Sequence, residues 1–248
     1  MLEKKVVLIT GAAKGMGESH ARICAGYGAI VVLADLDLNG EAVAQSIREA
    51  GGQASFYKLN VTSPENWKSV IDAILKEHSR LDGLVNNAGI VVSKPTEEIT
   101  EAELNLCIDV NFKGTFFGCQ AALPAFQAAG GGSIVNISST SGMVANLPGL
   151  SVYCATKAAV RLFTKAVALD YANYGIRANS VHPGTIETPM VAEYLADKST
   201  EELLAGAAIL KRVGKASEVS ETVAFLLSDR SSYMTGSELV VDGGVTAQ

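Results

Sequence analysis

The sequence predicts an α/β protein with a central parallel sheet that is covered by helices on both faces. Short apolar runs rich in β-branched residues alternate with helix-length stretches, which is the pattern of repeated strand-helix-strand units. Some runs, such as residues 30–34, are apolar throughout rather than alternating, as a strand buried on both faces requires. With 248 residues, 48% of them hydrophobic and 19% charged, the chain suits a single domain over residues 1–248.

The apolar runs also give the expected order of elements along the chain. One segment, residues 188–213, interrupts the alternation with two helical pieces, and we expect it to be an insert that covers the substrate. The predicted strands cover residues 6–10, 30–35, 54–60, 83–86, 133–138, 177–181 and 238–241.

Composition excludes several classes of function. A net charge of −6 leaves no basic surface for nucleic acid or an anionic membrane. The apolar run at residues 6–9 is too short for a signal peptide or a membrane span, so we expect a cytoplasmic protein. The four cysteines are widely spaced and the three histidines lack metal-ligand spacing, which predicts reduced thiols and no metal site.

A glycine-rich turn follows the first strand, and a helical pattern through about Tyr27 follows the turn. Its spacing, G-x-x-x-G-x-G, includes Gly11, Gly15, Met16 and Gly17. Such a turn lets the backbone approach a pyrophosphate, and the helix N-terminus offers N–H groups to it. A glycine-rich turn alone can serve only to reverse the chain and bind nothing, but this one lies between a strand and a helix. The order of Lys14 and Gly15 is the reverse of a P-loop, which argues against a nucleoside triphosphatase.

The second strand ends in an acid, Asp35, at 18 residues past Gly17 (35 − 17). That spacing is near the roughly 20 residues expected of a carboxylate that accepts from adenosine ribose hydroxyls. A carboxylate there would also repel a 2′-phosphate, so we expect NAD rather than NADP. The alternative is a solvated strand-end acid, and Lys14 argues the other way because it could reach a 2′-phosphate.

A serine, a tyrosine and a lysine form the candidate catalytic set. Ser139 follows the fifth predicted strand, and the carboxyl ends of parallel strands face the ligand crevice. Tyr153 and Lys157 are four residues apart, so on a helix they share one face and the ammonium would favour the phenolate. A tyrosine and lysine at this spacing are often ordinary neighbours on a helix. The serine upstream makes the pair a candidate acid–base site.

A serine hydrolase is the main alternative reading of this region. Residues 149–152 (Gly-Leu-Ser-Val) begin like the G-x-S-x-G nucleophile elbow, but Tyr153 stands where the motif needs glycine. The one histidine downstream, His182, has no acidic partner at triad spacing. The sequence therefore argues against acyl-transfer chemistry.

Taken together, the motifs resemble those of the short-chain dehydrogenase/reductase family, in order and over essentially the whole chain. The resemblance implies a Rossmann-type, doubly wound sheet of seven parallel strands. It also implies Tyr153 as the general acid–base, Lys157 as the residue that lowers its pKa, Ser139 as the group that orients the substrate, and Asn111 as the holder of a water. The motifs are Thr10-Gly11-x-x-x-Gly15-x-Gly17, Asn86-Asn87-Ala88-Gly89, Asn111, Ser139, Tyr153-x-x-x-Lys157 and Pro183-Gly184.

The resemblance also implies where a nicotinamide cofactor is bound. Tyr153 and Lys157 would contact the nicotinamide ribose, and Asn60 stands where the family often has an aspartate beside the adenine. The other implied contacts are Val61 at the adenine, Asn87, Ala88 and Gly89 at the adenosine ribose, and Pro183, Gly184, Ile186 and Thr188 near the carboxamide and pyrophosphate.

The segments at residues 181–189 and 236–248 are similar to bacterial secondary-alcohol dehydrogenases, including those that act on cyclic alcohols. They imply an NAD-dependent homotetramer that interconverts a secondary, alicyclic or other apolar alcohol and its ketone. Relatives with this tail can bind magnesium through the C-terminal residue, but Val245 replaces their frequent tyrosine and we expect no metal. A hydroxysteroid dehydrogenase and a 3-oxoacyl-carrier-protein reductase are the alternatives among enzymes. From another class, a cofactor-binding sensor would have lost the serine, tyrosine or lysine.

Apolar segments are predicted to form the walls of the substrate pocket. No lysine or arginine lies in them, so a charged substrate would lose hydration without a compensating cation. The same residues could instead be core or a subunit contact. The segments are Val91-Val92, residues 143–148, and, in the insert, Met190, Val191, Tyr194, Leu195, Leu203 and Leu204.

Overall fold

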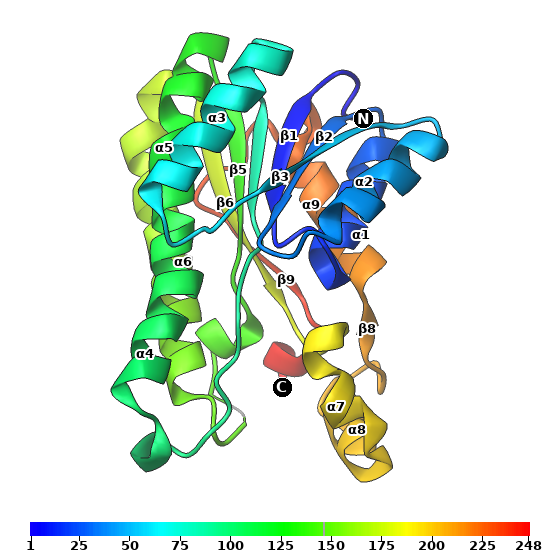
Figure 1. The fold of residues 1–248 in the computed structure, drawn as a ribbon. Helices are drawn as coiled ribbons and strands as arrows, with labels where there is room; N and C mark the ends of the chain where they lie inside the picture. The colour runs from blue at the N-terminus through cyan, green and yellow to red at the C-terminus, as the bar shows by residue number, and fades with distance from the viewer. Residues whose placement is uncertain (146) are drawn as a thin grey trace.

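Seven parallel strands form the centre of the molecule in the order β3-β2-β1-β4-β5-β6-β9 (Figure 1). The computed structural model of the chain describes residues 1–145 and 147–248. The chain runs outward from β1 in one direction to β3, then returns to β4 on the other side of β1. This reversal is the switch point of a doubly wound sheet, as the sequence predicted.

The elements are bounded as follows. The strands are β1 (Val6–Thr10), β2 (Ile30–Asp35), β3 (Gln53–Lys58), β4 (Gly83–Asn86), β5 (Gly132–Ile137), β6 (Ile176–Pro183), β7 (Ile186–Glu187), β8 (Gly214–Lys215) and β9 (Glu238–Val241). The α-helices are α1 (Gly15–Gly26), α2 (Gly40–Glu49), α3 (Pro64–His78), α4 (Glu101–Ile108), α5 (Gly114–Ala129), α6 (Ser151–Tyr171), α7 (Ala192–Ala196), α8 (Lys198–Gly206) and α9 (Ala216–Leu227). Among these described helices, none is both long and apolar enough to cross a membrane.

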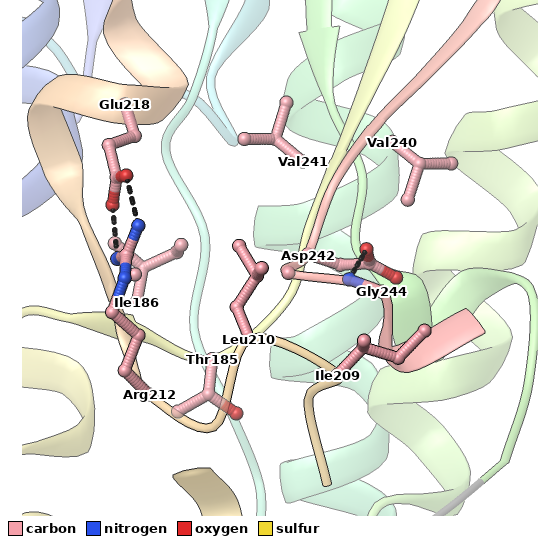
Figure 2. Close-up of a pocket in the computed structure, with 12 residues that line it drawn as sticks. Thr185, Ile186, Ile209, Leu210, Arg212, Glu218, Val240, Val241, Asp242 and Gly244 are labelled. Carbon is pink, nitrogen blue, oxygen red and sulfur yellow. Dashed lines mark hydrogen bonds and ion pairs between the residues drawn. The ribbon is translucent and has the colours of Figure 1, made fainter. Parts of the chain in front are cut away.

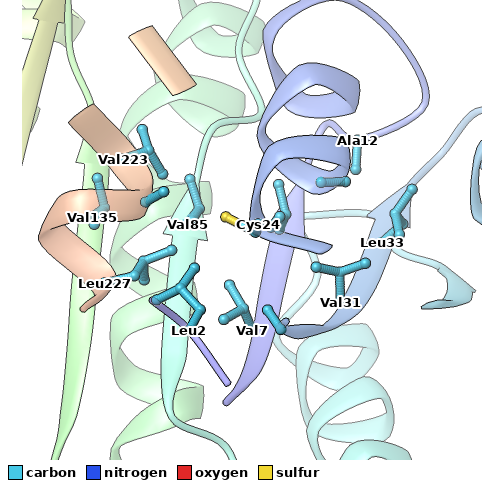
Figure 3. Close-up of a cluster of buried hydrophobic side chains, with 14 of the residues drawn as sticks. Leu2, Val7, Ala12, Cys24, Val31, Leu33, Val85, Val135, Val223 and Leu227 are labelled. Atoms are coloured by element: carbon cyan, nitrogen blue, oxygen red, sulfur yellow. The ribbon is translucent and has the colours of Figure 1, made fainter. Parts of the chain in front are cut away.

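Helices cover both faces of the sheet, with α1, α2 and α9 on one side and α3, α5 and α6 on the other (Figure 1). Successive residues of a strand point to opposite faces, so Val7 of β1 packs into one core cluster and Val6 and Leu8 into the other. Figure 3 shows the first cluster, where α1 and α9 meet the sheet. Burial on both faces explains why these strands are apolar throughout.

The predicted strands are confirmed, with shifts of one or two residues at some ends. β3 ends at Lys58 rather than Asn60, because the Asn60 side chain forms a turn by accepting from the backbone N–H of Thr62 at 3.1 Å. β6 continues to Pro183, where it pairs with Val241 of β9. The strands at residues 6–10, 30–35, 83–86 and 238–241 are as predicted.

The insert predicted at residues 188–213 lies outside the seven-stranded sheet, between β7 and β8. It contains α7 and α8, the two helical pieces that the sequence predicted. Just outside it, β7 and β8 pair in a two-stranded ladder, with Ile186 opposite Gly214 and Glu187 opposite Lys215. The ladder holds the two ends of the insert together at its base.

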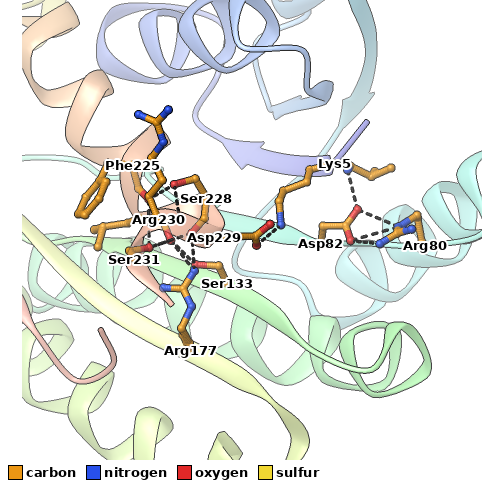
Figure 4. Close-up of polar contacts among 12 residues, drawn as sticks. Lys5, Arg80, Asp82, Ser133, Arg177, Phe225, Ser228, Asp229, Arg230 and Ser231 are labelled. Carbon is orange, nitrogen blue, oxygen red and sulfur yellow. Dashed lines mark hydrogen bonds and ion pairs between the residues drawn. The ribbon is translucent and has the colours of Figure 1, made fainter. Parts of the chain in front are cut away.

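At the edge opposite the expected ligand crevice, Arg177 of β6 binds the end of α9 (Figure 4). Its guanidinium donates to the carbonyl oxygens of Leu226 at 2.8 Å, Ser228 at 3.2 Å and Met234 at 3.3 Å. Carbonyls at a helix C-terminus lack partners within the helix and carry a partial negative charge, so a cation there is favourable. Arg177 therefore fixes α9 against the sheet.

Replacing Arg177 with leucine should lower the free energy of unfolding by about 2–3 kcal/mol, because buried carbonyls lose a charged donor. Urea unfolding measures the difference. Arg22→Leu is the matched control: that guanidinium is 44% exposed and pairs with Glu18 four residues away, so the loss should be about 0.5 kcal/mol or less. Equal losses in the two variants would contradict this role for Arg177.

Candidate active site

The loops that carry the predicted site residues leave the carboxyl ends of neighbouring strands. β1, β4, β5 and β6 lie side by side in the sheet, and β2 is next to β1. Because the strands are parallel, all these ends lie at one edge. The fold therefore brings together segments that are far apart in the sequence.

The glycines of the turn between β1 and α1 are required either by backbone conformation or by lack of space. Gly11 and Gly15 have φ of +64° and +61°, a region that favours glycine. A methyl group at Gly17 would lie 2.0 Å from the Gly11 carbonyl oxygen. Among the described residues no side chain caps α1, so its first N–H groups can bind an anion. The side chain of Met16 packs against the core, which leaves only its backbone for a ligand.

Asn87 holds the loop after β4 against the glycine turn. Its Nδ2 donates to the carbonyl oxygen of Thr10 at 2.9 Å, and its backbone N–H donates to Thr10 Oγ1 at 3.0 Å. Ala88 N–H donates to the same hydroxyl at 3.1 Å. Asn87 Oδ1 is buried and accepts no hydrogen bond from the described residues. A buried acceptor beside an anion-binding turn fits a dinucleotide, which would bring a ribose hydroxyl as donor.

Asp35 lies at the end of β2 and contacts the glycine turn directly. Its Oδ2 accepts from the backbone N–H of Ala13 at 3.0 Å, and its Oδ1 accepts from that of Asp37 at 3.0 Å. The carboxylate thus holds the turn, in addition to the ribose contact that the sequence predicts for it. The sequence did not predict this second role, because it depends on a contact between two separate loops.

Asn60 and Val61, the residues expected beside the adenine, lie in the turn after β3. The Oδ1 of Asn60 accepts from Thr62 N–H and from Thr62 Oγ1, the latter at 2.8 Å. Val61 is buried, and its carbonyl oxygen accepts from Trp67 Nε1 at 2.9 Å. The amide therefore builds the turn locally, and the tryptophan fixes Val61 in place.

Asn111 lies in a π-helical turn, Asp109–Lys113, where α4 passes into α5. Its side chain is buried and pairs with the backbone of Ile90: Oδ1 accepts from the N–H at 2.8 Å and Nδ2 donates to the carbonyl at 2.9 Å. Nδ2 also donates to Thr156 Oγ1 at 3.1 Å. Asn111 thereby links the loop after β4 to α6. No local pattern of residues indicates the π-turn, although such turns are frequent at functional sites.

Ser139 stands at the end of the β5 strand in extended backbone, with a side chain that is 9% exposed. Its Oγ accepts from the backbone N–H of Ser141 at 3.1 Å. The preceding Ser138 donates through Oγ to the carbonyl oxygen of Lys157 at 2.8 Å. The loop is therefore tied to the helix that carries the tyrosine and lysine.

Tyr153 and Lys157 lie one turn apart on α6, with Lys157 Nζ at 5.7 Å from the centre of the tyrosine ring. A methyl group at Gly89 would lie 3.4 Å from this Nζ and 3.3 Å from Asn111 Oδ1. The hydrogen bond between Tyr153 and Ser139 acts to lower the phenol pKa. The fold thus brings Asn111, Ser139, Tyr153 and Lys157 together.

The expected lowering of the phenol pKa by Lys157 is not found in the chain by itself. Burial raises the pKa of Tyr153 to about 12, which outweighs the hydrogen bond with Ser139. Burial also lowers the pKa of Lys157 to about 8. The reason is geometric: Lys157 is buried and its Nζ donates to the carbonyl oxygen of Ile137 at 2.8 Å, while the Tyr153 side chain is half-buried.

The loop after β6 lies against the glycine turn. Pro183 ends the strand, and Gly184 donates its N–H to the carbonyl oxygen of Val241 at 3.0 Å. Further along, the Thr188 Cβ lies 3.5 Å from the position of a methyl group at Gly15. The loop and the turn therefore form two walls of one site, with Ile186 buried between the loop and the core.

A cavity of about 470 Å³ adjoins this loop beneath the end of the insert (Figure 2). Ile186, Ile209 and Leu210 line it, with the Arg212–Glu218 ion pair on one wall. None of the predicted substrate-wall residues that the structure describes lines this cavity. Instead Met190, Tyr194 and Leu203 are exposed, and their role as walls stays a prediction. Of the predicted segment 143–148, Asn146 lies outside the described residues.

Metal ligands are not clustered in the part of the chain that the structure describes. Over residues 1–145 and 147–248, no group of three or more His, Cys, Asp and Glu side chains could hold a metal ion. The C-terminal Gln248 donates through Nε2 to the carbonyl oxygen of Ala207 at 2.6 Å.

Three relatives with named activities are similar to the chain over almost its full length. A cyclopentanol dehydrogenase of Comamonas sp. is 46% identical, with 98% of this chain and 97% of the relative covered. A trans-4-hydroxycyclohexanecarboxylate dehydrogenase of Sinomonas cyclohexanicum is 42% identical, with 98% and 93% covered. A 3-alpha-(or 20-beta)-hydroxysteroid dehydrogenase of Mycobacterium bovis is also 42% identical, with 98% and 90% covered.

Solved structures and a family model agree with these relatives. A short-chain type dehydrogenase/reductase from Mycobacterium marinum has a TM-score of 0.95 and 38% identity, with 100% of this chain and 97% of that one covered. A gluconate 5-dehydrogenase from Burkholderia cenocepacia, in complex with NADP and tartrate, has a TM-score of 0.96 and 33% identity over the same shares. The family model described as enoyl-(acyl carrier protein) reductase matches residues 11–246. The chain therefore belongs to the short-chain dehydrogenase/reductase family, and it is an oxidoreductase that uses a nicotinamide cofactor.

Proposed function

We propose that this enzyme interconverts a secondary alicyclic alcohol and its ketone, with NAD as cofactor. The observation that carries the proposal is the meeting of Ser139, Tyr153 and Lys157 at the carboxyl edge of the sheet, beside a glycine turn. The similarity to a cyclopentanol dehydrogenase supports the substrate class. The insert at residues 188–213 carries exposed apolar side chains, which supports its role in covering such a substrate.

In alcohol oxidation, Tyr153 is the base and Ser139 orients the substrate oxygen. The Ser139 hydroxyl bonds the alcohol oxygen, and Tyr153 Oη removes the hydroxyl proton as the ketone forms. When bound, NAD supplies the acceptor for the hydride that leaves the same carbon. In ketone reduction Tyr153 returns the proton. Below a pH of about 8 Lys157 carries its charge and favours the phenolate, which opposes the effect of burial on Tyr153.

The choice of NAD rests on Asp35. Its carboxylate lies against the glycine turn through Ala13 N–H, so a 2′-phosphate on the adenosine ribose would lie close to a negative charge. Lys14 is exposed beside the same turn and would favour the phosphate. We give Asp35 the larger weight because it is held by two backbone N–H groups, whereas the exposed Lys14 is solvated.

A hydroxysteroid substrate is the second candidate, supported by the mycobacterial relative. The carrier-protein reductase alternative is weaker: a net charge of −6 disfavours docking of an acidic carrier. For the location of the enzyme, the four free thiols support a reducing, cytoplasmic compartment.

Rates with matched substrates test the proposed substrate class. We expect cyclopentanol and cyclohexanol to give a kcat/KM at least tenfold above that of trans-4-hydroxycyclohexanecarboxylate, an anionic 3-hydroxy acid and a bulky steroid alcohol. A carboxylate loses hydration in an apolar pocket, and Lys94, which follows the predicted wall at Val91-Val92, is already paired with Glu103. Reduced nicotinamide absorbance reports the rate. A preference for an anion or for the steroid would refute the proposal.

Replacing Tyr153 with phenylalanine should lower kcat by about 10²–10⁴-fold, because the ring packs alike while the transferable proton is lost. The dissociation constant for NAD, measured by fluorescence titration, should stay within about threefold, since Tyr153 is only one of many cofactor contacts that we expect. Tyr174→Phe, at an exposed tyrosine, is the control and should keep full turnover. More than about a tenth of wild-type turnover in Tyr153→Phe would end the assignment.

Replacing Asp35 with asparagine should move the ratio of kcat/KM for NAD to that for NADP toward NADP by about tenfold or more. The change removes the negative charge, worth about 1–2 kcal/mol near the surface, and keeps an oxygen that can accept from Ala13 N–H. Asp37→Asn, at a half-buried acid two residues along, should leave the ratio unchanged. If the unmodified enzyme preferred NADP, Lys14 rather than Asp35 would determine the cofactor preference.

We also propose that the enzyme is a homotetramer. Leu162 and Leu169 of α6 share one helix face and are 70% and 80% exposed, and Val240 on the edge strand β9 is 39% exposed. Two separate apolar faces can build a dimer of dimers. Leu162→Lys with Leu169→Lys should halve the mass measured by light scattering while circular dichroism is unchanged. A monomeric parent protein would contradict the proposal.

A further inference from the structure

His182 is a buried histidine whose ring lies beside the loop that carries Ser139. It is in β6, is 0% exposed, and its Nδ1 lies 3.2 Å from the carbonyl oxygen of Ser139. Its Nε2 lies 2.8 Å from Ser180 Oγ on the same strand. Nothing in the proposed chemistry uses the imidazole, although it touches the backbone of a residue assigned to the substrate.

The backbone ladder explains why a side chain is needed at this point. β5 and β6 pair up to Ile137 and Val181, and Ser138 then donates its N–H to the carbonyl oxygen of Val181 at 2.8 Å. Pro183 has no N–H, so it cannot extend the ladder along the Ser138–Ser139 segment. Beyond this end of the ladder, the imidazole of His182 supplies the contact from β6 to the next residue, Ser139.

The hydrogen-bond partners fix the form of the ring. A carbonyl oxygen can only accept, so Nδ1 carries the proton, and Nε2 then accepts from the Ser180 hydroxyl. Burial lowers the pKa of His182, which keeps this neutral form at physiological pH. The ring is thus held from both sides in one tautomer.

We propose that His182 is a positioning residue that sets the orientation of Ser139 toward the substrate oxygen and Tyr153. The Ser138 side chain holds one side of the loop through the carbonyl of Lys157, and His182 holds the other. This inference rests on the proposed role of Ser139. A displacement of about 1 Å in a substrate-orienting group can cost up to about 100-fold in rate, so loss of this bond should be visible in turnover.

The test is a double-mutant cycle with Ser139→Ala and His182→Leu, measured as kcat for cyclopentanol with saturating NAD. We expect His182→Leu alone to lower kcat about 10–100-fold, with the dissociation constant for NAD within twofold. On the Ser139→Ala background, His182→Leu should have no further effect, because the group that it positions is gone. Additive losses in the cycle would overturn the proposal.

Two conservative changes keep the test informative if His182→Leu does not fold. His182→Asn places an amide N–H at the position of Nδ1 and should recover most of the lost turnover. Ser180→Ala removes the partner that fixes the tautomer and should lower kcat by a few fold. The proposal would be contradicted if His182→Asn had no higher kcat than His182→Leu, or if Ser180→Ala kept the kcat of the unmodified enzyme.

His20→Leu is the matched control for loss of a buried histidine. His20 is also 0% exposed and its Nδ1 lies 2.7 Å from a serine hydroxyl, that of Ser220, but it lies between α1 and α9. Its effect should be additive with Ser139→Ala. If Ser139→Ala itself leaves kcat unchanged, the proposed function fails. If Ser139→Ala lowers kcat but the effect of His182→Leu on kcat is additive with it, only the positioning role fails.

Discussion

Burial of the parallel sheet on both faces is the constraint from which the rest of the molecule follows. A buried strand must pair every backbone N–H and carbonyl group, and parallel neighbours can be joined only by crossover helices. Each crossover returns the chain to the edge of the sheet where the strands begin. Every strand therefore ends at the opposite edge, among one group of loops. The polar side chains there are brought together by the connectivity of the backbone rather than by attraction to one another.

At that edge the strands stop pairing, and side chains take over their hydrogen bonds. Asn111 pairs with the backbone of Ile90 through both its donor and its acceptor, as a neighbouring strand would. Asn87 holds the end of β1 by donating from Nδ2 to the Thr10 carbonyl oxygen and from its backbone N–H to Thr10 Oγ1. These amides stiffen loops that would otherwise be held only at their ends. A site built in this way is rigid before any ligand arrives, which is what orienting a hydride acceptor at the carbon and a proton acceptor at the oxygen of one alcohol requires.

The sequence was sufficient for the strands, for the glycine turn and for the four residues that meet at the site. Continuous apolar runs and short motifs are local patterns, so they can be recognised without knowledge of tertiary contacts. The predicted direction of the Tyr153 pKa shift was wrong for the chain by itself, because burial is a property of the whole fold and here outweighs the hydrogen bond with Ser139. Likewise, the contact of Asp35 with Ala13 and the π-turn at Asn111 arise from packing between distant segments. Helical spacing alone could place Lys157 near Tyr153, but it could not show that its ammonium is directed at Ile137.

The short ladder between β7 and β8 separates the insert from the rest of the protein. Since Ile186 and Glu187 are paired with Gly214 and Lys215, the chain leaves and re-enters the fold at one point. The segment in between is therefore an exchangeable cassette. Doubling its length would add only about 0.6 kcal/mol to the entropy cost of closing it, far less than the cost of disturbing a core strand. Recombination or design can replace this cassette as a unit, while the sheet and the loops at its carboxyl edge are inherited intact.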